Sequence, residues 1–71
     1  MEHLTIGQAM RKARKAKKYT LEKLEKKAGI SRQSIGRWER DKVSPNILNV
    51  ISIADVLGVT LDELVGRTVE R

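Results

Sequence analysis

The segment 20–38 constrains the fold of this chain more than any other part of the sequence, because two short helical patterns flank a glycine there. Leu21, Leu24 and Ala28 recur at spacings of three and four residues, which is typical of the buried side of a helix. Gly29 ends this pattern, since glycine adopts the left-handed conformation that follows many helices without steric cost. The segment therefore predicts two helices joined by a tight turn.

The second helix of the pair is predicted to begin after Ser31, whose hydroxyl can accept a backbone N–H of the first turn. Ile35 and Trp38 are three residues apart, so both are predicted to face the first helix. The opposite face has no acidic residue, and arginine and glutamine side chains match the hydrogen-bonding edges of guanine and adenine. Serine there can serve a base or a phosphate. We predict base contacts from this face by Arg32, Gln33, Ser34 and Arg37.

The charge of the chain is unevenly distributed. Residues 1–42 hold 13 Lys and Arg against 5 Asp and Glu, a net charge of +8, whereas residues 43–71 hold 2 against 4, a net charge of −2, which together give +6. A basic half on a small domain is typical of a protein that binds a polyanion. With one Trp, one Tyr and no Phe, the chain lacks the aromatic surface on which single-stranded bases stack. The composition therefore favours double-stranded DNA as the partner.

Several function classes do not fit the sequence. There is no cysteine, and the only histidine, His3, has no second histidine with which to bind a metal. No Ser/His/Asp or Cys/His set and no plausible carboxylate pair is present for catalysis. No apolar run is long enough to span a membrane, and no N-terminal signal segment precedes the first helix. We therefore predict a cytoplasmic protein that is not an enzyme and has no metal, cofactor or small-molecule ligand.

Three further helices are predicted around this pair, within a single domain of residues 1–71 that has a loose leader at 1–4 and a loose tail at 66–71. The first begins after the cap Thr5 and continues to about Lys17. Its apolar residues recur at helical spacing on one side. This buried side comprises Ile6, Ala9, Met10 and Ala13.

The fourth helix is predicted after the cap Asn46, from residue 47 to residue 57, and Gly58 ends it. A short fifth helix begins with a capping box between Thr60 and Glu63 and ends at Leu64 or Val65. The fourth helix is apolar over so wide an arc that we place it at the centre of the core. The residues assigned to the core are Ile47, Val50, Ile51, Ile53, Ala54 and Leu57.

Several short motifs occur in one order and spacing along most of the chain. They are Leu24 with Gly29-Ile30-Ser31, Ser34-Ile35 with Trp38-Glu39, Lys42 with Pro45, and Leu57-Gly58-Val59-Thr60-Leu61-Asp62-Glu63-Leu64. From Ile6 to Val65 the chain resembles the lambda-repressor-like family of bacterial and phage regulators (the Xre/Cro type). The resemblance implies an all-α, compact five-helix domain whose second and third helices form the helix-turn-helix. It also implies a small DNA-binding transcriptional regulator, encoded by a bacterium or phage, that places its third helix in the major groove.

The resemblance also implies roles for particular residues. Arg14 and Glu39 correspond to a structural ion pair that ties the first helix to the end of the third. Family members commonly form dimers on operators with two-fold symmetry, so we predict a weak homodimer. Its possible interface comprises Val59, Leu61, Leu64 and Val65. Predicted phosphate contacts are Thr20, Ser31, Arg40, Lys42 and Asn46, with Lys17 and Lys18 as looser candidates, and the three polar caps can also serve their helices alone.

Three positions depart from the family pattern. Leu21 stands where the family usually has a glutamine that contacts a phosphate or the recognition helix. Glu25 stands where a small alanine is usual, so its carboxylate must point outward or pair with a base such as Arg32. Asp41 replaces a common glycine, and aspartate tolerates the left-handed conformation better than most residues. These departures predict weaker or less conventional operator binding.

One alternative is a protein-interaction module, such as an antitoxin, for which DNA binding is secondary. It predicts an extra apolar patch outside the core, and the tail from Gly66 is the place to look for it. Another is a plain helical hairpin with a solvated polar face, and a third is a basic helix at a membrane surface. The short glycine-containing turn and the basic, acid-free outer face favour DNA binding over all three.

Overall fold

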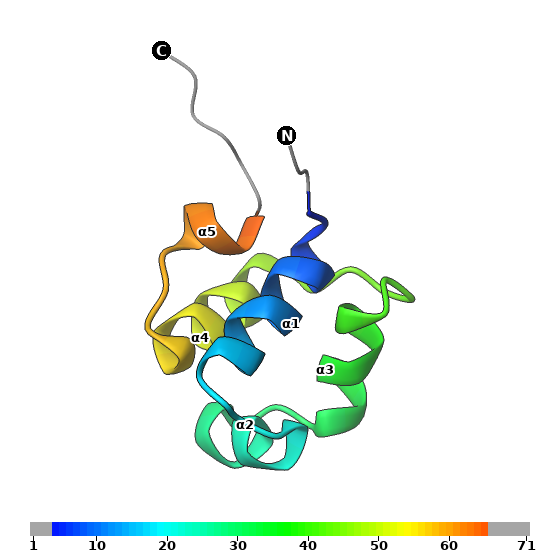
Figure 1. The fold of residues 1–71 in the computed structure, drawn as a ribbon. Helices are drawn as coiled ribbons and strands as arrows, with labels where there is room; N and C mark the ends of the chain where they lie inside the picture. Colours follow the sequence, from blue (N-terminus) through cyan, green and yellow to red (C-terminus); the bar gives the residue numbers. More distant parts are fainter. Residues whose placement is uncertain (1–3, 66–71) are drawn as a thin grey trace.

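Five α-helices form the fold in the structure, a computed structural model that describes residues 4–65. No strand occurs in this range. Figure 1 shows α1 in the middle of the molecule, and α1 packs against both α3 and α5. The predicted all-α, five-helix architecture is confirmed. The helices are α1 (Ile6–Ala16), α2 (Leu21–Ala28), α3 (Arg32–Glu39), α4 (Ile47–Leu57) and α5 (Leu61–Val65).

Polar caps fix the start of each of the first four helices. The side chains of Thr5, Thr20, Ser31 and Asn46 each accept a hydrogen bond from the backbone N–H three residues later. These bonds satisfy N–H groups that the first turn of a helix leaves unpaired. At the start of α5, Thr60 and Glu63 form the predicted reciprocal cap, with Thr60 N donating to Glu63 Oε1 at 2.7 Å. The helix starts were therefore predictable from local chemistry.

The helix ends also follow the prediction. Gly29 and Gly58, which end α2 and α4, have φ values of 71° and 69°. Asp41 follows α3 with a φ of 60°, the left-handed conformation expected there. The backbone N–H of Lys42 then donates to Arg37 O at 2.9 Å and closes the last turn of α3. The loop after α3 thus leaves the helix in one defined direction.

Every helix contributes to one hydrophobic core. The helix-turn-helix packs its apolar side inward through Leu24 and Ile35, which are fully buried. Trp38 is 7% exposed and belongs to the same core cluster. The remaining buried apolar residues are Ala9, Met10, Val50, Ile53, Ala54, Leu57 and Leu64. This core therefore draws on both halves of the chain.

The prediction that α4 is buried over a wide arc was wrong for Ile47 and Ile51. Ile47 is 58% exposed and Ile51 is 38% exposed, and the neighbouring Leu48 is 71% exposed. The buried stripe of α4 is narrower, because α1, α2 and α5 all contact it from the Val50 side. Ile47, Leu48 and Ile51 therefore form an exposed apolar patch, called the α4 patch below.

Two terminal assignments also change. Leu4, expected in the loose leader, packs against the core. Leu64, predicted as a possible dimer contact, has no exposed surface because the monomer's own core surrounds it. Residues 1–3 and 66–71, which include His3 and the predicted tail, lie outside the described residues.

Helices α1 and α3 approach each other closely near the start of α1. A Cβ added at Gly7 would lie only 1.8 Å from the backbone oxygen of Trp38, so only glycine fits there. Beside it, the Thr5 hydroxyl donates to Asp41 Oδ1 at 2.8 Å. Glycine at position 41 would adopt the positive φ with less strain than aspartate. The aspartate carboxylate instead provides a hydrogen bond that joins the end of α3 to the start of α1.

Arg14 and Glu39 join the same two helices at a second point. Arg14 Nε donates to Glu39 Oε2 at 2.7 Å and Nη2 donates to Oε1 at 2.9 Å, which is the two-pronged geometry of a strong pair. The third donor, Nη1, binds the backbone oxygen of Tyr19 at 2.8 Å. The hydrogen bond with Glu39 raises the pKa of Arg14 above its ordinary value. The pair holds the end of α3 against α1 and against the turn that leads into α2.

Removing this pair should destabilise the whole domain. Glu39→Ala should lower the free energy of unfolding by about 2–5 kcal/mol, because it leaves the Arg14 charge unpaired in a largely buried position. Asp55→Ala, which removes an exposed carboxylate, should change it by about 0.5 kcal/mol or less. Thermal and urea unfolding of both variants measure this difference. Equal stability of the two variants would contradict the structural role of the pair.

Candidate nucleic-acid interface

The outer face of α3 is polar, exposed and free of acidic side chains. Arg32, Gln33 and Arg37 are exposed and Ser34 is half-buried. The one carboxylate in α3, Glu39, is turned to the opposite side and neutralised by Arg14. The short helix α3 therefore presents donors and acceptors outward while its other side is fixed to α1 and α2.

Arg32 is the first residue of α3, and its guanidinium is held from α2. Arg32 Nε donates to Glu25 Oε1 at 2.8 Å. The side chains stay accessible, with 53% of Arg32 and 32% of Glu25 exposed. The suggestion that Glu25 pairs with Arg32 is thus confirmed. A shallow hollow that also involves Ser31 and Gln33 surrounds this pair.

The two serines at the start of α3 bond to each other. Ser31 Oγ accepts the backbone N–H of Ser34 and donates to Ser34 Oγ, both at 3.1 Å. Ser34 Oγ therefore has its own hydrogen left to donate to a neighbouring acceptor. This arrangement suits either of the two contacts predicted for Ser34.

Two cations that sequence reasoning did not assign to the interface, Arg11 and Lys15, lie with the predicted Arg40 at the junction of α1, α2 and α3. The hollow there is lined by Arg11, Lys15, Leu21 and Arg40, beside the Arg14–Glu39 pair. Arg40 Nη1 would lie 3.2 Å from a Cβ at Gly36, so its guanidinium lies over the glycine backbone. The spacing of four residues between Arg11 and Lys15 places both on one side of α1 and was the available indication. Leu21 itself is half-buried and packs against the core.

The predicted phosphate contacts lie at different places. Thr20, Ser31 and Asn46 cap the starts of α2, α3 and α4, where backbone N–H groups favour an anion. Arg40 and Lys42 are exposed at the end of α3. Two of the three helix starts belong to the helix-turn-helix itself, and the two cations follow it directly along the chain.

The two looser candidates differ from each other. Lys18 is exposed in the turn between α1 and α2, with a φ of 62°. The ammonium of Lys17 instead lies near Gly58, which ends α4, at 3.8 Å from where a Cβ would stand. Carbonyl groups at a helix C-terminus attract a cation. The predicted phosphate contact of α4 is at its start, beside Asn46, whereas Lys17 lies at its end. We therefore leave Lys17 out of the interface.

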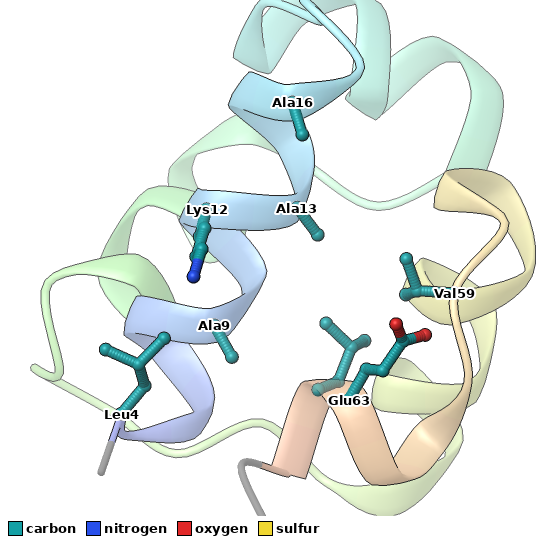
Figure 2. A pocket seen from close by; sticks show the side chains of 8 residues that line it. Leu4, Ala9, Lys12, Ala13, Ala16, Val59 and Glu63 are labelled. Atoms are coloured by element: carbon teal, nitrogen blue, oxygen red, sulfur yellow. The ribbon is translucent and has the colours of Figure 1, made fainter. Parts of the chain in front are cut away.

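A groove of about 340 Å³ lies between α1 and the segment formed by Val59 and α5. Figure 2 shows Ala9, Ala13 and Ala16 along one wall, with Val59 and Glu63 on the other. The Glu63 carboxylate is occupied by the N–H of Thr60 at the start of α5. Ligand sites usually combine apolar walls with several converging polar groups, which this groove lacks. We assign it no ligand.

The remaining predicted interface residues are only partly accessible. Leu61 is 38% exposed, whereas Val59 and Val65 are half-buried and Leu64 is buried. Within residues 59–65 the exposed apolar surface is therefore small, and the α4 patch is the larger one among the described residues.

No helix between residues 4 and 65 is long and apolar enough to cross a membrane. Over the same range, no group of three or more His, Cys, Asp or Glu side chains is arranged to hold a metal ion.

Comparison with known proteins decides the family. The helix-turn-helix family model matches residues 10–64, which is most of the chain and includes all of α2, α3 and α4. The chain belongs to the lambda-repressor-like helix-turn-helix family. Its second and third helices, α2 and α3, are joined by the Gly29 turn. This is a family of DNA-binding regulators and not of enzymes.

Two solved structures of this helix-turn-helix fold resemble the chain. The P22 c2 repressor in complex with a synthetic operator aligns with a TM-score of 0.80 and 31% identity, over 87% of this chain and 94% of that one. The restriction-modification controller protein C.AhdI of Aeromonas hydrophila aligns with a TM-score of 0.79 and 30% identity, over 83% and 89%.

The immunity repressor of Bacillus phage phi105 is a helix-turn-helix relative with 33% identity over 64 residues. That match covers 90% of this chain and 44% of the repressor. The chain spans about half the length of this and two further relatives from Bacillus subtilis, at 44%, 58% and 54%. The family relationship therefore concerns the helix-turn-helix domain.

Proposed function

We propose that this protein is a sequence-specific regulator that binds double-stranded DNA with α3 in the major groove. The observation that carries this proposal is the outer face of α3, where exposed Arg32, Gln33 and Arg37 stand on a helix held rigidly from behind. The operator in the P22 c2 complex supports the same partner for a related domain. We place its action in the bacterial cytoplasm, without an enzymatic step.

Base contacts fall to the residues exposed on α3. Arginine can donate two parallel hydrogen bonds to guanine O6 and N7, and glutamine can pair with adenine N7 and N6. We assign these contacts to Arg32, Arg37 and Gln33, with Ser34 serving a base or a phosphate. The opposite face of the helix, through Ile35 and Trp38, keeps α3 fixed on the core.

Phosphate contacts fall to groups around α3. The N–H groups at the starts of α2, α3 and α4, beside Thr20, Ser31 and Asn46, can bind phosphates without a formal charge. Leu21 cannot donate a hydrogen bond, and we propose that the nearby cations replace the anchor it lacks. The cationic contacts in this proposal are Arg11, Lys15, Lys18, Arg40 and Lys42.

A homodimer is the assembly we propose on DNA. Two copies on a two-fold symmetric operator would place their α3 helices one helical turn apart, about 10 base pairs. Leu61 and the α4 patch supply exposed apolar side chains for contact between the copies. Leu64, being buried, is left out.

The interaction-module alternative keeps one supporting observation. It predicted an apolar patch outside the core, and the α4 patch is one. The tail from Gly66, where that patch was expected, lies outside the described residues. Self-association on DNA, tested below, separates the two uses of this surface.

Salt dependence tests the proposed phosphate contacts. The logarithm of affinity for a duplex should fall linearly with the logarithm of salt concentration, by about 0.9 per contact, so the five cationic contacts allow about 4.5 per protein copy. Arg40→Ala should reduce this slope by about one unit, whereas Lys17→Ala should leave it unchanged. Titrations of a labelled duplex at several salt concentrations measure the slopes. No binding to any duplex at low salt would reject the DNA proposal.

Base-pair variants of a selected operator separate specific contacts from charge attraction. Arg37→Ala should lose about 1–3 kcal/mol on the preferred site and remove the preference at one base pair per half-site. Lys18→Ala should weaken all duplexes equally. Lysine and alanine both carry a Cβ, so this substitution leaves the backbone at the positive φ of position 18 undisturbed. The two affected pairs should lie about 10 base pairs apart. An equal loss on every duplex would make Arg37 a phosphate contact.

Half-site and full-site duplexes test the dimer. Leu48→Ser and Leu61→Ser, made separately, should leave binding to an isolated half-site unchanged, because neither replaces a proposed DNA contact. The variant that removes the dimer contact should bind the full-site duplex about tenfold more weakly than wild type. This loss corresponds to about 1.4 kcal/mol of binding free energy from the buried apolar side chain. Titration of both duplexes and sedimentation of the complexes measure this. Independent binding of wild-type copies to two adjoining half-sites would exclude the dimer.

A further inference from the structure

The ion pair between Glu25 and Arg32 leaves one edge of the guanidinium unoccupied. Glu25 Oε1 accepts from Nε, which lies on the side of the arginine fork. The two terminal nitrogens, Nη1 and Nη2, keep hydrogens on the end of the fork. That end edge, with one donor on each terminal nitrogen, can still donate two parallel hydrogen bonds to guanine O6 and N7. The carboxylate thus holds Arg32 without competing for the donors that guanine needs.

Stability does not account for this pair. An exposed ion pair contributes little to folding, and both side chains here are substantially exposed. The acidic charge also opposes the attraction of the basic half for phosphates, since Glu25 lies next to the helix that faces DNA. A carboxylate at this place therefore weakens general DNA binding while it orients one arginine.

We propose that Glu25 is a positioning residue that makes Arg32 selective for guanine. This inference rests on the proposed DNA-binding function. The hydrogen bond to Nε restricts Arg32 to one rotamer before DNA binds. Less side-chain conformational entropy is therefore lost when Arg32 contacts a base. If Arg32 turned instead to a phosphate, the Glu25 carboxylate would lose its partner beside the negatively charged backbone. The pair therefore disfavours the non-specific use of Arg32 as well as favouring the specific one.

Removing the Glu25 carboxylate should have opposite effects on the affinity for DNA in general and on the preference for guanine. Glu25→Ala should bind non-preferred duplexes as tightly as wild type or more tightly, because a negative charge is removed. Its preference for guanine at the pair contacted by Arg32 should fall by about tenfold, within the range of one two-pronged base contact. Glu25→Gln, which keeps an acceptor oxygen without the charge, should retain part of the preference.

Glu22→Ala is the matched control. Glu22 lies three residues earlier on α2, is exposed, and loses the same charge without touching Arg32. This variant should shift the affinity of all duplexes by one common factor and keep the guanine preference. A double-mutant cycle adds the second test, since Glu25→Ala should have no effect on base preference once Arg32→Ala is present.

The experiment titrates each variant against an operator selected from random duplexes and its single-base-pair variants, with melting temperatures measured alongside. A guanine preference unchanged in Glu25→Ala, or unchanged in Arg32→Ala, would overturn the inference and leave the DNA-binding proposal standing. Wild-type protein that binds all duplexes equally would overturn both. Loss of the preference in Glu25→Ala at an unchanged melting temperature, with the preference kept in Glu22→Ala, supports the inference.

Discussion

The contact between α1 and α3 is the constraint on which the arrangement of the outer surface depends. Gly7 lets the start of α1 approach the backbone oxygen of Trp38, and the Arg14–Glu39 pair joins the same helices further along. Two separated points of attachment fix both the position and the direction of α3. A recognition helix of eight residues has too few internal hydrogen bonds to be stable alone. The direction in which α3 presents its outer face therefore depends on its packing against α1 and α2, and the buried Arg14–Glu39 pair is one of the contacts that fix it.

The departures at Leu21, Glu25 and Asp41 each place a side chain against another part of the domain. Leu21 gives up a possible phosphate contact and packs on the core, while Arg40 lies over Gly36 within the cation cluster nearby. Glu25 restrains Arg32, and Asp41 ties the end of α3 to Thr5. Charge remains available from flexible side chains around the edge. Of the side chains proposed to contact bases, Arg32 is held by Glu25 and Ser34 by Ser31, which favours selectivity over raw affinity.

Most of the fold could be predicted from the sequence because its determinants are local. Caps at Thr5 and Asn46 and the glycine at position 29 act within one turn of chain, so their residue types and spacing suffice. The exposure of Ile47 and Ile51 could not be predicted, since an apolar residue on α4 is buried only if another helix covers it. Of the candidate site, the outward face of α3 followed from helical periodicity. The placement of Lys17 beside Gly58 did not, because it depends on how α1 meets the end of α4.

The two ends of α4 have different surroundings, and this bears on how dimerisation and DNA binding are related. Its start carries the Asn46 cap and the first residues of the α4 patch, whereas its end is buried through Leu57 and closed by Gly58 near Lys17. A partner copy that covered Ile47 and Leu48 would hold the same turn of helix whose first N–H groups, those not used by the Asn46 cap, are proposed to bind a phosphate. Dimer contact and phosphate binding would each restrict the motion of this first turn of α4. Either one would therefore lower the entropy cost of the other. The proposed dimer would then be weaker in solution than on an operator, because both contacts use this turn of helix, without any change in the core.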